Sequence, residues 1–429
     1  MSEAPAGMLT PRGYRPRVAD EAVAERLGAA GAVLIEGPKG CGKTWTALSR
    51  ARSAVRFDAD AAARRLVTVS PETVLEGAAP RLLDEWQTAP EIWNHVRHAC
   101  DRSGEKGRFL LTGSALPVDD VVRHSGAGRI ARVRLRPMSL YESGQSTGLV
   151  SLGRLLDGGP AEAGASAVDF GDVCEAICVG GWPWLVGSPP PSAQRSLLDY
   201  LEEVRRLEPV ETSRRGRNPV LVEKLLVSLA RNIATTAPNS RLASDADPEQ
   251  PLNHQTVRAY LDALTRLFVV EDLPAWPTHL RSRARLTKSP KRHFVDPSLA
   301  AAALRASPAS LLSDLEACGL LFESLAVRDL RVYAEACDCD LYHHRTDSGL
   351  EADAVIRRRY SSEWIAVEVK LSHSPSVVDA AAATLLRVAE SIDTSKAGPR
   401  AALLVITPAG YAHTRPDGVT VAPIGSLGP

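Results

Sequence analysis

The sequence has no net charge and no long apolar run. Lysine and arginine together number 51, and aspartate and glutamate together also number 51, so the formal net charge at pH 7 is +0. This balance excludes a protein that coats nucleic acid through its overall charge, although it leaves local basic patches open. Because no run of about 18 apolar residues occurs, we expect no membrane-spanning helix and no membrane partner.

The cysteine and histidine patterns typical of metal or disulfide frameworks are also missing. The 7 cysteines are scattered, their number is odd, and no two form a C-x-x-C pair. The 10 histidines show no spacing typical of metal ligands. Reduced thiols are the simpler interpretation, and they are typical of the cytoplasm. We therefore expect a cytoplasmic protein without structural zinc or disulfides.

One glycine-rich motif is strong and lies in a suitable context. The segment Gly37–Thr44 fits the pattern G-x-x-x-x-G-K-[ST]. It follows an apolar run at 32–35, which is typical of a buried strand, and it precedes 45–50, which can begin a helix. The glycines let backbone N–H groups turn onto phosphates, Lys43 would reach the β- and γ-phosphates, and Thr44 would hold Mg²⁺. The predicted ligands are ATP and Mg²⁺, and the predicted nucleotide contacts are Gly37, Pro38, Lys39, Gly40, Cys41, Gly42, Lys43 and Thr44.

Strand-like and helix-like segments alternate from about residue 18 to about residue 135. This alternation is typical of an α/β fold with a doubly wound parallel sheet. Ligands of such sheets bind beyond the carboxyl ends of the strands, which is where the glycine-rich segment lies. The expected strands are 32–35, 54–58, 81–84, 109–112 and 130–135.

Hydrolysis needs an acid that holds the metal and a group that orients water. Asp84 and Glu85 follow an apolar strand and can supply both functions, Asp84 on Mg²⁺ and Glu85 on the attacking water. Ser114, or Thr112 before it, ends the next strand and would touch the γ-phosphate or the water. Arg129 would supply positive charge to the transition state, in cis in a monomer or in trans in a ring. The structural alternatives are an exposed acidic pair, an ordinary strand-end turn and a surface arginine.

A helix and a basic segment in the middle of the chain indicate contact with nucleic acid. Residues 253–264 carry apolar side chains at helical spacing, and 267–273 are expected to form a strand. The segment 281–292 then carries six cations and no acid, so on the wing of a winged helix it would grip the phosphates of DNA or RNA. A solvated hairpin, or one docked on the N-terminal domain, is the alternative. A second cluster comprises Arg205, Arg206, Arg214, Arg215 and Arg217.

Near the C-terminus, two expected strands bring carboxylates beside a lysine. The strands are 350–356 and 363–370, and a strand period of two puts Glu368 and Lys370 on one face, where Asp353 can join them. Carboxylate oxygens suit Mg²⁺, which would activate water and stabilise charge on a scissile phosphate. Lys370 would position the water or neutralise the phosphate. A charged, solvated hairpin face is the structural alternative.

The motifs together resemble one family of ATPases. The order of P-loop, Asp-Glu and Thr-Gly-Ser resembles the AAA-type ATPases. Further segments resemble the bacterial and archaeal family in which an AAA-type ATPase is fused to a C-terminal domain of unknown function 4143. Those segments are Leu83–Gln87, Leu110–Ser114, Gly128-Arg129, Arg136–Ser139 with Tyr141-Glu142, Gly180–Pro183 and Pro290–Leu299, the last matching K-x-x-F-x-D-P-x-L. The resemblance spans roughly 20–410 and implies an ATPase core, a winged-helix region and a nuclease-like C-terminal domain. Arg81 departs from it by placing a charge in the strand before Asp84.

The C-terminal residues resemble the PD-(D/E)xK nuclease superfamily. The resemblance rests on Asp353 and on Glu368-x-Lys370, and it implies a further acidic residue on the preceding helix, where Glu323 matches. It implies Glu323, Asp353 and Glu368 as metal ligands, and Glu368 and Lys370 as catalytic residues.

Length and resemblance together give the expected domains. At 429 residues the chain is long enough for two or three ordinary domains. We expect an ATPase domain at 18–140, a helical lid or linker at 141–215, a winged-helix-like region at 216–305 and a nuclease-like domain at 310–425. Our first hypothesis is an ATP-hydrolysing enzyme that acts on nucleic acid and self-associates through its ATPase domain. The alternatives are a nucleotide-dependent binding switch and a winged-helix regulator, with a catalytically inactive C-terminal domain.

Overall fold

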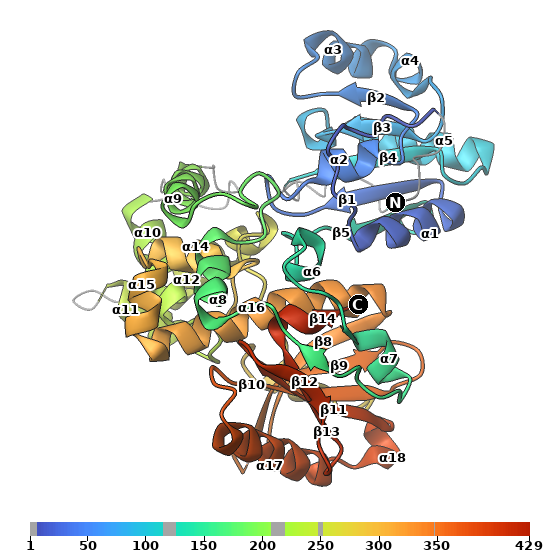
Figure 1. The fold of residues 1–429 in the computed structure, drawn as a ribbon. Coiled ribbons are helices and arrows are strands. Elements are labelled where there is room, and N and C mark those ends of the chain that lie inside the picture. Colours follow the sequence, from blue (N-terminus) through green and yellow to red (C-terminus); the bar gives the residue numbers. More distant parts are fainter. Residues whose placement is uncertain (1–6, 115–125, 207–218, 248–251, 347) are drawn as a thin grey trace. The chain divides into compact units, whose positions relative to one another are not determined.

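The computed structural model describes residues 7–114, 126–206, 219–247, 252–346 and 348–429. The chain divides into two compact units: unit 1 comprises residues 1–137 with 266–268, and unit 2 comprises residues 138–265 with 269–429 (Figure 1). The first boundary lies close to the expected one near residue 140. The segments expected as a lid, a winged-helix-like region and a nuclease-like domain lie in unit 2, apart from residues 266–268.

Unit 1 is built around a five-stranded sheet in the order β2-β3-β4-β1-β5, in which every neighbouring pair is parallel. The strands are β1 (Ala32–Glu36), β2 (Ser53–Arg56), β3 (Arg81–Asp84), β4 (Phe109–Gly113) and β5 (Ile130–Arg134). This confirms the predicted α/β fold and its five strands, whose bounds shift by one or two residues. Because β1 lies between β4 and β5, the glycine-rich loop leaves the sheet beside the carboxyl ends of these two strands, and β3 lies next beyond β4.

Helices cover the sheet of unit 1 through a core rich in aromatic side chains. They are α1 (Ala19–Ala29), α2 (Lys43–Leu48), α3 (Ala61–Val69), α4 (Pro71–Leu75) and α5 (Ile92–Ser103). Helices α3, α4 and α5 share one hydrophobic cluster with alternate residues of β1, β3 and β4. Trp86 and Trp93 lie in it with their ring centroids 4.9 Å apart. Trp86 follows Glu85 directly, so this packing anchors the end of β3.

Arg81 lies at the start of its strand rather than in the buried part. Its guanidinium donates to the Val74 carbonyl at 2.7 Å and to Ser53 Oγ at 3.0 Å. Burial lowers its pKa below the ordinary value. The charge that departs from the family pattern is therefore satisfied by polar partners, and β3 remains apolar at Leu82 and Leu83.

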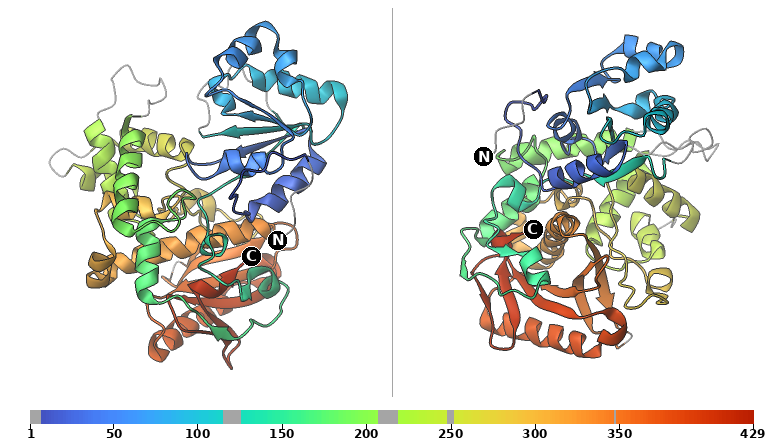
Figure 2. Two further views of the ribbon diagram at one scale, coloured as in Figure 1. Left: turned by 45° about the horizontal axis from the view of Figure 1, so that its top comes forward. Right: turned by 90° about the vertical axis from the view of Figure 1, so that its right-hand side faces the viewer.

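Unit 2 contains a mixed seven-stranded sheet in the order β7-β12-β13-β11-β10-β9-β8. Strand β10 runs parallel to β11 and antiparallel to β9, which is antiparallel to β8. Helices α16 (Leu315–Ala336) and α17 (Pro375–Ser391) cover opposite faces of this sheet (Figure 2). The strands are β7 (Gly164–Ala165), β8 (Cys339–Arg345), β9 (Glu351–Arg358), β10 (Trp364–Val369), β11 (Arg400–Thr407), β12 (Tyr411–Thr414) and β13 (Val419–Pro423). Two short strands, β6 (Val150–Ser151) and β14 (Leu427–Gly428), pair separately.

A group of helices forms the rest of unit 2. They are α6 (Leu140–Ser143), α7 (Leu152–Leu156), α8 (Phe170–Val179), α9 (Pro190–Arg206), α10 (Pro219–Arg231), α11 (Asn239–Ala246), α12 (His254–Arg266), α13 (Ala284–Thr287), α14 (Pro297–Ala303), α15 (Pro308–Ser313) and α18 (Thr394–Ala397). Helix α12 confirms the helix expected at 253–264. The strand expected at 267–273 is not formed in this described stretch, because Phe268 adopts φ +56° and the backbone turns. Where a wing was expected, the described residues form only two isolated antiparallel bridges, Val270–Phe294 and Leu273–Lys291.

The Asp-Pro motif of the family resemblance forms a buried polar network. Asp296 accepts hydrogen bonds from the N–H groups of Gly181 and Ser298, each at 2.9 Å, and from Arg328 Nη1 at 3.0 Å. Arg328 also pairs with Asp329 at 2.6 Å. The network joins the Gly180–Pro183 motif, helix α14 and helix α16, so these motif residues are structural.

Across the residues that the structure describes, no helix is both long and apolar enough to cross a bilayer.

Candidate functional site

The glycine-rich segment forms a loop whose glycines are required by its backbone. Gly40 and Gly42 adopt φ +80° and φ +104°, a region that favours glycine. A Cβ on Gly37 would lie 2.0 Å from the Leu135 carbonyl oxygen, so only glycine fits there. Lys43 is buried and its Nζ donates to the Pro38 carbonyl at 2.8 Å. The lysine therefore lies folded against the loop that it is expected to use.

Thr44 and Asp84 meet as a Mg²⁺ site requires. Thr44 Oγ1 donates to Asp84 Oδ1 at 2.8 Å, and Thr112 Oγ1 donates to the same oxygen. Asp84 is fully buried, and its Oδ2 has no hydrogen-bond partner among the described residues. The Nε atom of Arg56 lies 3.5 Å from Oδ2. A buried carboxylate oxygen that accepts no hydrogen bond, beside a threonine hydroxyl, suits a hard cation, so these residues fit Mg²⁺. Sequence reasoning missed Arg56, although its place at the carboxyl end of β2 was an available signal.

Glu85 is held at the same edge of the sheet. Its backbone is left-handed, with φ +54°, which is strained for a residue other than glycine. Its N–H donates to Thr112 Oγ1 at 3.1 Å, and its carboxylate accepts from Ser114 Oγ at 3.1 Å and from Gln87 Nε2. Ser114 therefore contacts the acid that would orient water. Gln87 was missed as a site residue, although it ends the segment Leu83–Gln87 that carries the family resemblance.

Arg129 lies at the amino ends of the parallel strands, whereas the glycine-rich loop lies at their carboxyl ends. It precedes β5, and the N–H of Ala32, at the start of β1, donates to its carbonyl at 3.1 Å. Strands β1 and β5 run parallel with Ala32 beside Ile130, so the length of β1, about 16 Å at 3.3 Å per residue, separates Arg129 from Gly37. Its guanidinium donates to Asp101 Oδ1 at 2.7 Å instead. The structure therefore does not bring Arg129 to the nucleotide site of its own chain.

The glycine-rich loop also contacts the segment by which the chain leaves unit 1. Arg17 Nη1 donates to the Cys41 carbonyl at 2.9 Å, and Arg17 Nη2 donates to the Arg136 carbonyl at 2.8 Å. Cys41 Sγ lies 3.4 Å from the Leu135 carbonyl oxygen. Unit 1 ends at Pro137. One buried arginine thus ties the phosphate-binding loop to the residues just before the boundary.

The C-terminal residues do not form the predicted metal centre. Lys370 Nζ pairs with Glu368 Oε1 at 2.6 Å. Glu323 Oε1 and Asp353 Oδ1 instead face Lys291 Nζ, at 2.8 Å and 3.0 Å. Within the described ranges, no group of three or more His, Cys, Asp or Glu side chains is arranged to hold a metal ion. Sequence reasoning placed Glu323 and Asp353 together, as the structure does, but it missed the lysine between them.

Burial governs the protonation of these groups. It raises the pKa of Glu323 and of Glu368, and the charge of Asp353 adds to both shifts. Burial alone would lower the pKa of Lys291, but the carboxylates of Asp353, Glu323 and Glu351 together outweigh it and raise that pKa above the ordinary value. The surrounding carboxylates therefore stabilise the charged form of Lys291.

The basic segment 281–292 is only partly available to a phosphate backbone. Lys291 is buried among carboxylates, and Arg292 is buried and pairs with Asp272. Arg281 and Arg283 are exposed. Two of the six cations thus serve inside the protein.

The second arginine cluster is largely balanced by acids. Arg205 pairs with Glu202 at 2.7 Å, and Arg206 pairs with it at 3.2 Å. Arg214, Arg215 and Arg217 lie outside the described residues.

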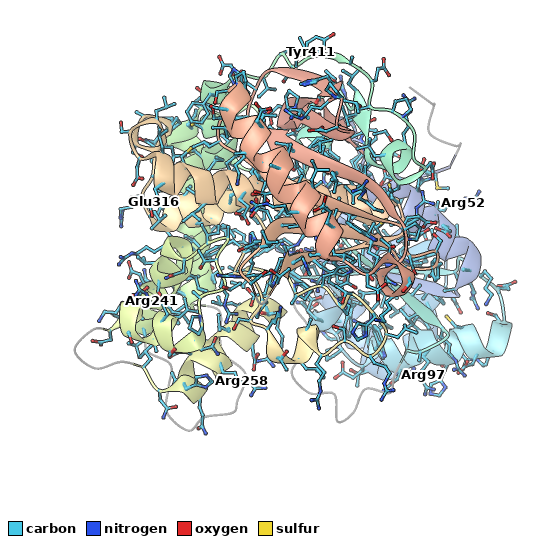
Figure 3. The ribbon with its side chains drawn as sticks, turned by 90° about the horizontal axis from the view of Figure 1, so that it is seen from below. Arg52, Arg97, Arg241, Arg258, Glu316 and Tyr411 are labelled. Atoms are coloured by element: carbon cyan, nitrogen blue, oxygen red, sulfur yellow. The ribbon has the colours of Figure 1, made fainter. Side chains whose placement is uncertain are left out.

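Two further arginines outside these clusters, Arg241 on α11 and Arg258 on α12, point outward from the helices (Figure 3).

Family comparisons match three consecutive parts of the chain. Residues 29–144 match a family described as "AAA domain", residues 171–310 match a domain of unknown function, DUF8612, and residues 318–427 match DUF4143. The first match contains the five strands of unit 1 and the glycine-rich loop. The third contains Asp353, Glu368 and Lys370. The middle match includes Lys291 and helix α12.

Curated relatives and solved structures are distant. Uncharacterized proteins of Mycobacterium bovis and Mycobacterium tuberculosis are each 26% identical over 361 residues, covering 80% of this chain and 71% of their own. The Walker-type ATPase of Pyrococcus abyssi is 14% identical with a TM-score of 0.42, covering 70% of this chain and 99% of that one. AMPPCP-bound DnaA from Aquifex aeolicus is 13% identical with a TM-score of 0.27, covering 61% and 92%.

The matched residues and the observed sheet agree on the nature of unit 1. The strand order, the glycine-rich loop and the paired Asp84 and Glu85 lie inside the segment that matches the AAA family. The resemblance to a C-terminal domain of unknown function 4143 is likewise confirmed by the match at 318–427. Residues 29–144 therefore match the AAA domain family and form an α/β fold with a P-loop, and residues 318–427, after a helical region, match the DUF4143 family.

Proposed function

We propose that the chain binds ATP with Mg²⁺ and hydrolyses ATP in unit 1. The observation that carries the proposal is the hydrogen-bond network that joins Thr44, Asp84, Thr112 and the Glu85 N–H. The Thr112 hydroxyl bonds the Asp84 carboxylate and the Glu85 N–H, and Thr44 bonds the same Asp84 oxygen. Metal-binding and water-orienting groups are thus tied together at the carboxyl ends of neighbouring parallel strands, where ligands of such sheets bind.

The binding residues have separable roles. Lys43 would exchange its bond to the Pro38 carbonyl for phosphate oxygens. Thr44 and Asp84 would hold Mg²⁺, which neutralises charge on the phosphates. The glycine-rich loop supplies backbone N–H groups to the phosphate oxygens.

Glu85 would orient the attacking water and accept its proton. Ser114 and Gln87 bond the Glu85 carboxylate, so they would set its direction and hold it when no substrate water is present. The strained backbone of Glu85 supports a functional role, because such strain persists where the surroundings impose it.

We also propose that ATP acts as a switch and that the C-terminal domain is a binding module rather than a nuclease. Arg17 bonds both the Cys41 and the Arg136 carbonyls, so a shift of the phosphate-binding loop would reach the chain where it leaves unit 1. The pairing of Glu323 and Asp353 with Lys291 supports a C-terminal domain without metal chemistry.

Nucleic acid is a candidate partner because Arg281 and Arg283 are exposed in a segment without acids. The 7 cysteines are all free, which supports a cytoplasmic location. Labelled DNA and RNA should bind with a salt-dependent affinity that weakens in Arg281→Glu/Arg283→Glu and changes with ATP. Equal binding by this variant and by wild type would contradict the proposal that this segment binds nucleic acid.

The ATPase proposal is tested with a fluorescent ATP analogue and a phosphate-release assay on the full chain. Lys43→Ala should lose nucleotide affinity and hydrolysis together, because the lysine contacts phosphate in both the ground state and the transition state. Lys106→Ala, at an exposed lysine of unit 1 outside the loop, is the matched control and should change affinity by less than about threefold. Undiminished hydrolysis by Lys43→Ala would contradict the proposal.

A further inference from the structure

A lysine ammonium occupies the centre of the C-terminal acidic cluster. Lys291 is buried, with 3% of its side chain exposed. Its Nζ lies 2.8 Å from Glu323 Oε1, 2.8 Å from Glu351 Oε1 and 3.0 Å from Asp353 Oδ1. Two of its three N–H donors make hydrogen bonds, to Glu323 and Asp353, and Glu351 adds an ion pair, so carboxylates surround the ammonium.

The cluster is assembled from three separate elements of unit 2. Lys291 pairs across an isolated bridge with Leu273 in the helical region. Glu323 lies on α16, while Glu351 and Asp353 lie two residues apart on β9. The ammonium therefore links the helical region to the C-terminal sheet. The backbone of Lys291 is fixed by two hydrogen bonds with the backbone of Leu273.

Asp353 is engaged on both of its oxygens. Oδ1 faces Lys291, and Oδ2 accepts the N–H of Val369 at 2.9 Å. Close to Asp353, β9 has one residue more than its partner β8, since Tyr342 pairs with Val355 whereas His344 pairs with Ala352. Such bulges redirect side chains. This aspartate is thus placed to accept two internal donors.

A divalent metal does not fit beside this ammonium. Mg²⁺ needs carboxylate oxygens at about 2.0–2.1 Å. The oxygens that would have to supply them, on Glu323 and Asp353, are already turned onto Lys291. Two cations cannot share these oxygens, because their mutual repulsion in a buried site is large. The remaining predicted ligand, Glu368, pairs with Lys370 through Oε1 at 2.6 Å. Its Oε2 is buried without a hydrogen-bond partner among the described residues, but one carboxylate oxygen alone does not make a Mg²⁺ site.

We propose that Lys291 is a permanent internal cation that takes the place of the divalent metal in this domain, so that the domain binds no Mg²⁺ there and cleaves no nucleic acid. The cation is part of the fold and joins the helical region to the C-terminal sheet. This proposal deepens the proposed role of the C-terminal domain as a binding module, and it is independent of ATP hydrolysis in unit 1.

Mn²⁺ titration of the nucleotide-free full chain, read by the EPR signal of free Mn²⁺, tests the proposal. Wild type and Asp353→Asn should bind the same amount of Mn²⁺, because Asp353 holds no metal in wild type. Lys291→Met, which keeps the side-chain length and removes the charge, should gain one Mn²⁺ site, with an affinity about tenfold or more above background. That gain should disappear in Lys291→Met/Asp353→Asn. Lys370→Met is the matched control, because it removes the neighbouring cation and leaves Lys291 in place, and it should gain no site.

Two outcomes would overturn the proposal. One is Mn²⁺ binding, or Mn²⁺-dependent cleavage of DNA or RNA, by wild type that is lost in Asp353→Asn. The other is a folded Lys291→Met variant that gains no site. If Lys291→Met does not fold, the comparison of wild type with Asp353→Asn still decides. Unit 1 lies outside these comparisons, so failure of the ATPase proposal would appear separately as loss of hydrolysis.

Discussion

Replacing Asp296 by alanine removes the acceptor at the centre of the buried network of unit 2. Asp296 is fully buried and serves three donors, the N–H groups of Gly181 and Ser298 and the guanidinium of Arg328. Each buried donor left without an acceptor costs about 1–3 kcal/mol. The three donors share one network and do not add independently. We therefore expect Asp296→Ala to lower the free energy of unfolding of unit 2 by about 3–5 kcal/mol.

Differential scanning calorimetry of the full chain measures this loss. A change of about 3–5 kcal/mol corresponds to a fall of about 6–20 °C in Tm for a large unit. Saturating ATP should stabilise the transition of unit 1, which identifies the transition that belongs to unit 2. Glu162→Gln is the control, since it removes an exposed ion pair with Arg154, in which the two side chains are 59% and 56% exposed, and should change stability by less than about 1 kcal/mol. Equal shifts in the two variants would refute the structural role of Asp296.

Three further predictions concern the nucleotide site and the pH response. Thr112→Val should lower kcat for ATP hydrolysis about 10–100-fold at nearly unchanged nucleotide affinity. The reason is that Asp84 and the Glu85 N–H lose the hydroxyl that both of them bond. An unchanged kcat would contradict this prediction. Arg129→Ala should hydrolyse ATP within about threefold of wild type, and a loss near 10³-fold would show instead that Arg129 acts on a neighbouring copy. Burial, with the charge of Lys291 adding, lowers the pKa of His343 to about 4. As pH falls from about 6.5 towards 4, the unfolded chain takes up a proton that the folded chain does not, so stability drops by about 2 kcal/mol at pH 5. The Tm of His343→Gln should therefore depend less on pH between 7 and 5, and an unchanged slope would contradict the assignment.

The nucleotide site was largely predictable because its signals are local. A glycine-rich loop between a strand and a helix, and an acidic pair after another apolar strand, determine where Lys43, Thr44, Asp84 and Glu85 meet once the sheet is parallel. The same logic shows why the expectation for Arg129 failed in cis. A residue that precedes a parallel strand lies at the edge opposite the loop, and the expected strand 130–135 already implied this.

The C-terminal centre was harder to predict because burial of a charge depends on distant partners. Lys291 was counted with its basic neighbours, although it is also the lysine of the K-x-x-F-x-D-P-x-L segment, which sets it apart from Arg281. Its partners lie 32 to 62 residues away. One signal was available. Glu351 lies two residues before Asp353 on an expected strand, so both side chains point to the same face. This gave the site one carboxylate beyond the three predicted metal ligands, which indicated a further cation.

The strand expected at 267–273, on which the predicted wing depended, is not formed for a local reason that the sequence does not display. Residues 267–273 have strand-like composition, but Phe268 follows helix α12 with φ +56°, a conformation that turns the chain. Composition reports β propensity only weakly, and the packing around the helix end decides the outcome.

The central claim is that Glu85 acts in hydrolysis on ATP bound by the glycine-rich loop. Single-turnover hydrolysis of ATP with Mg²⁺ by wild type and by Glu85→Gln, with the Kd of ATP measured in parallel, tests it most directly. The account predicts a Kd within about threefold of wild type and a hydrolysis rate lower by about 100-fold or more, because the amide can accept no proton from water. Equal hydrolysis rates in the two proteins would contradict it.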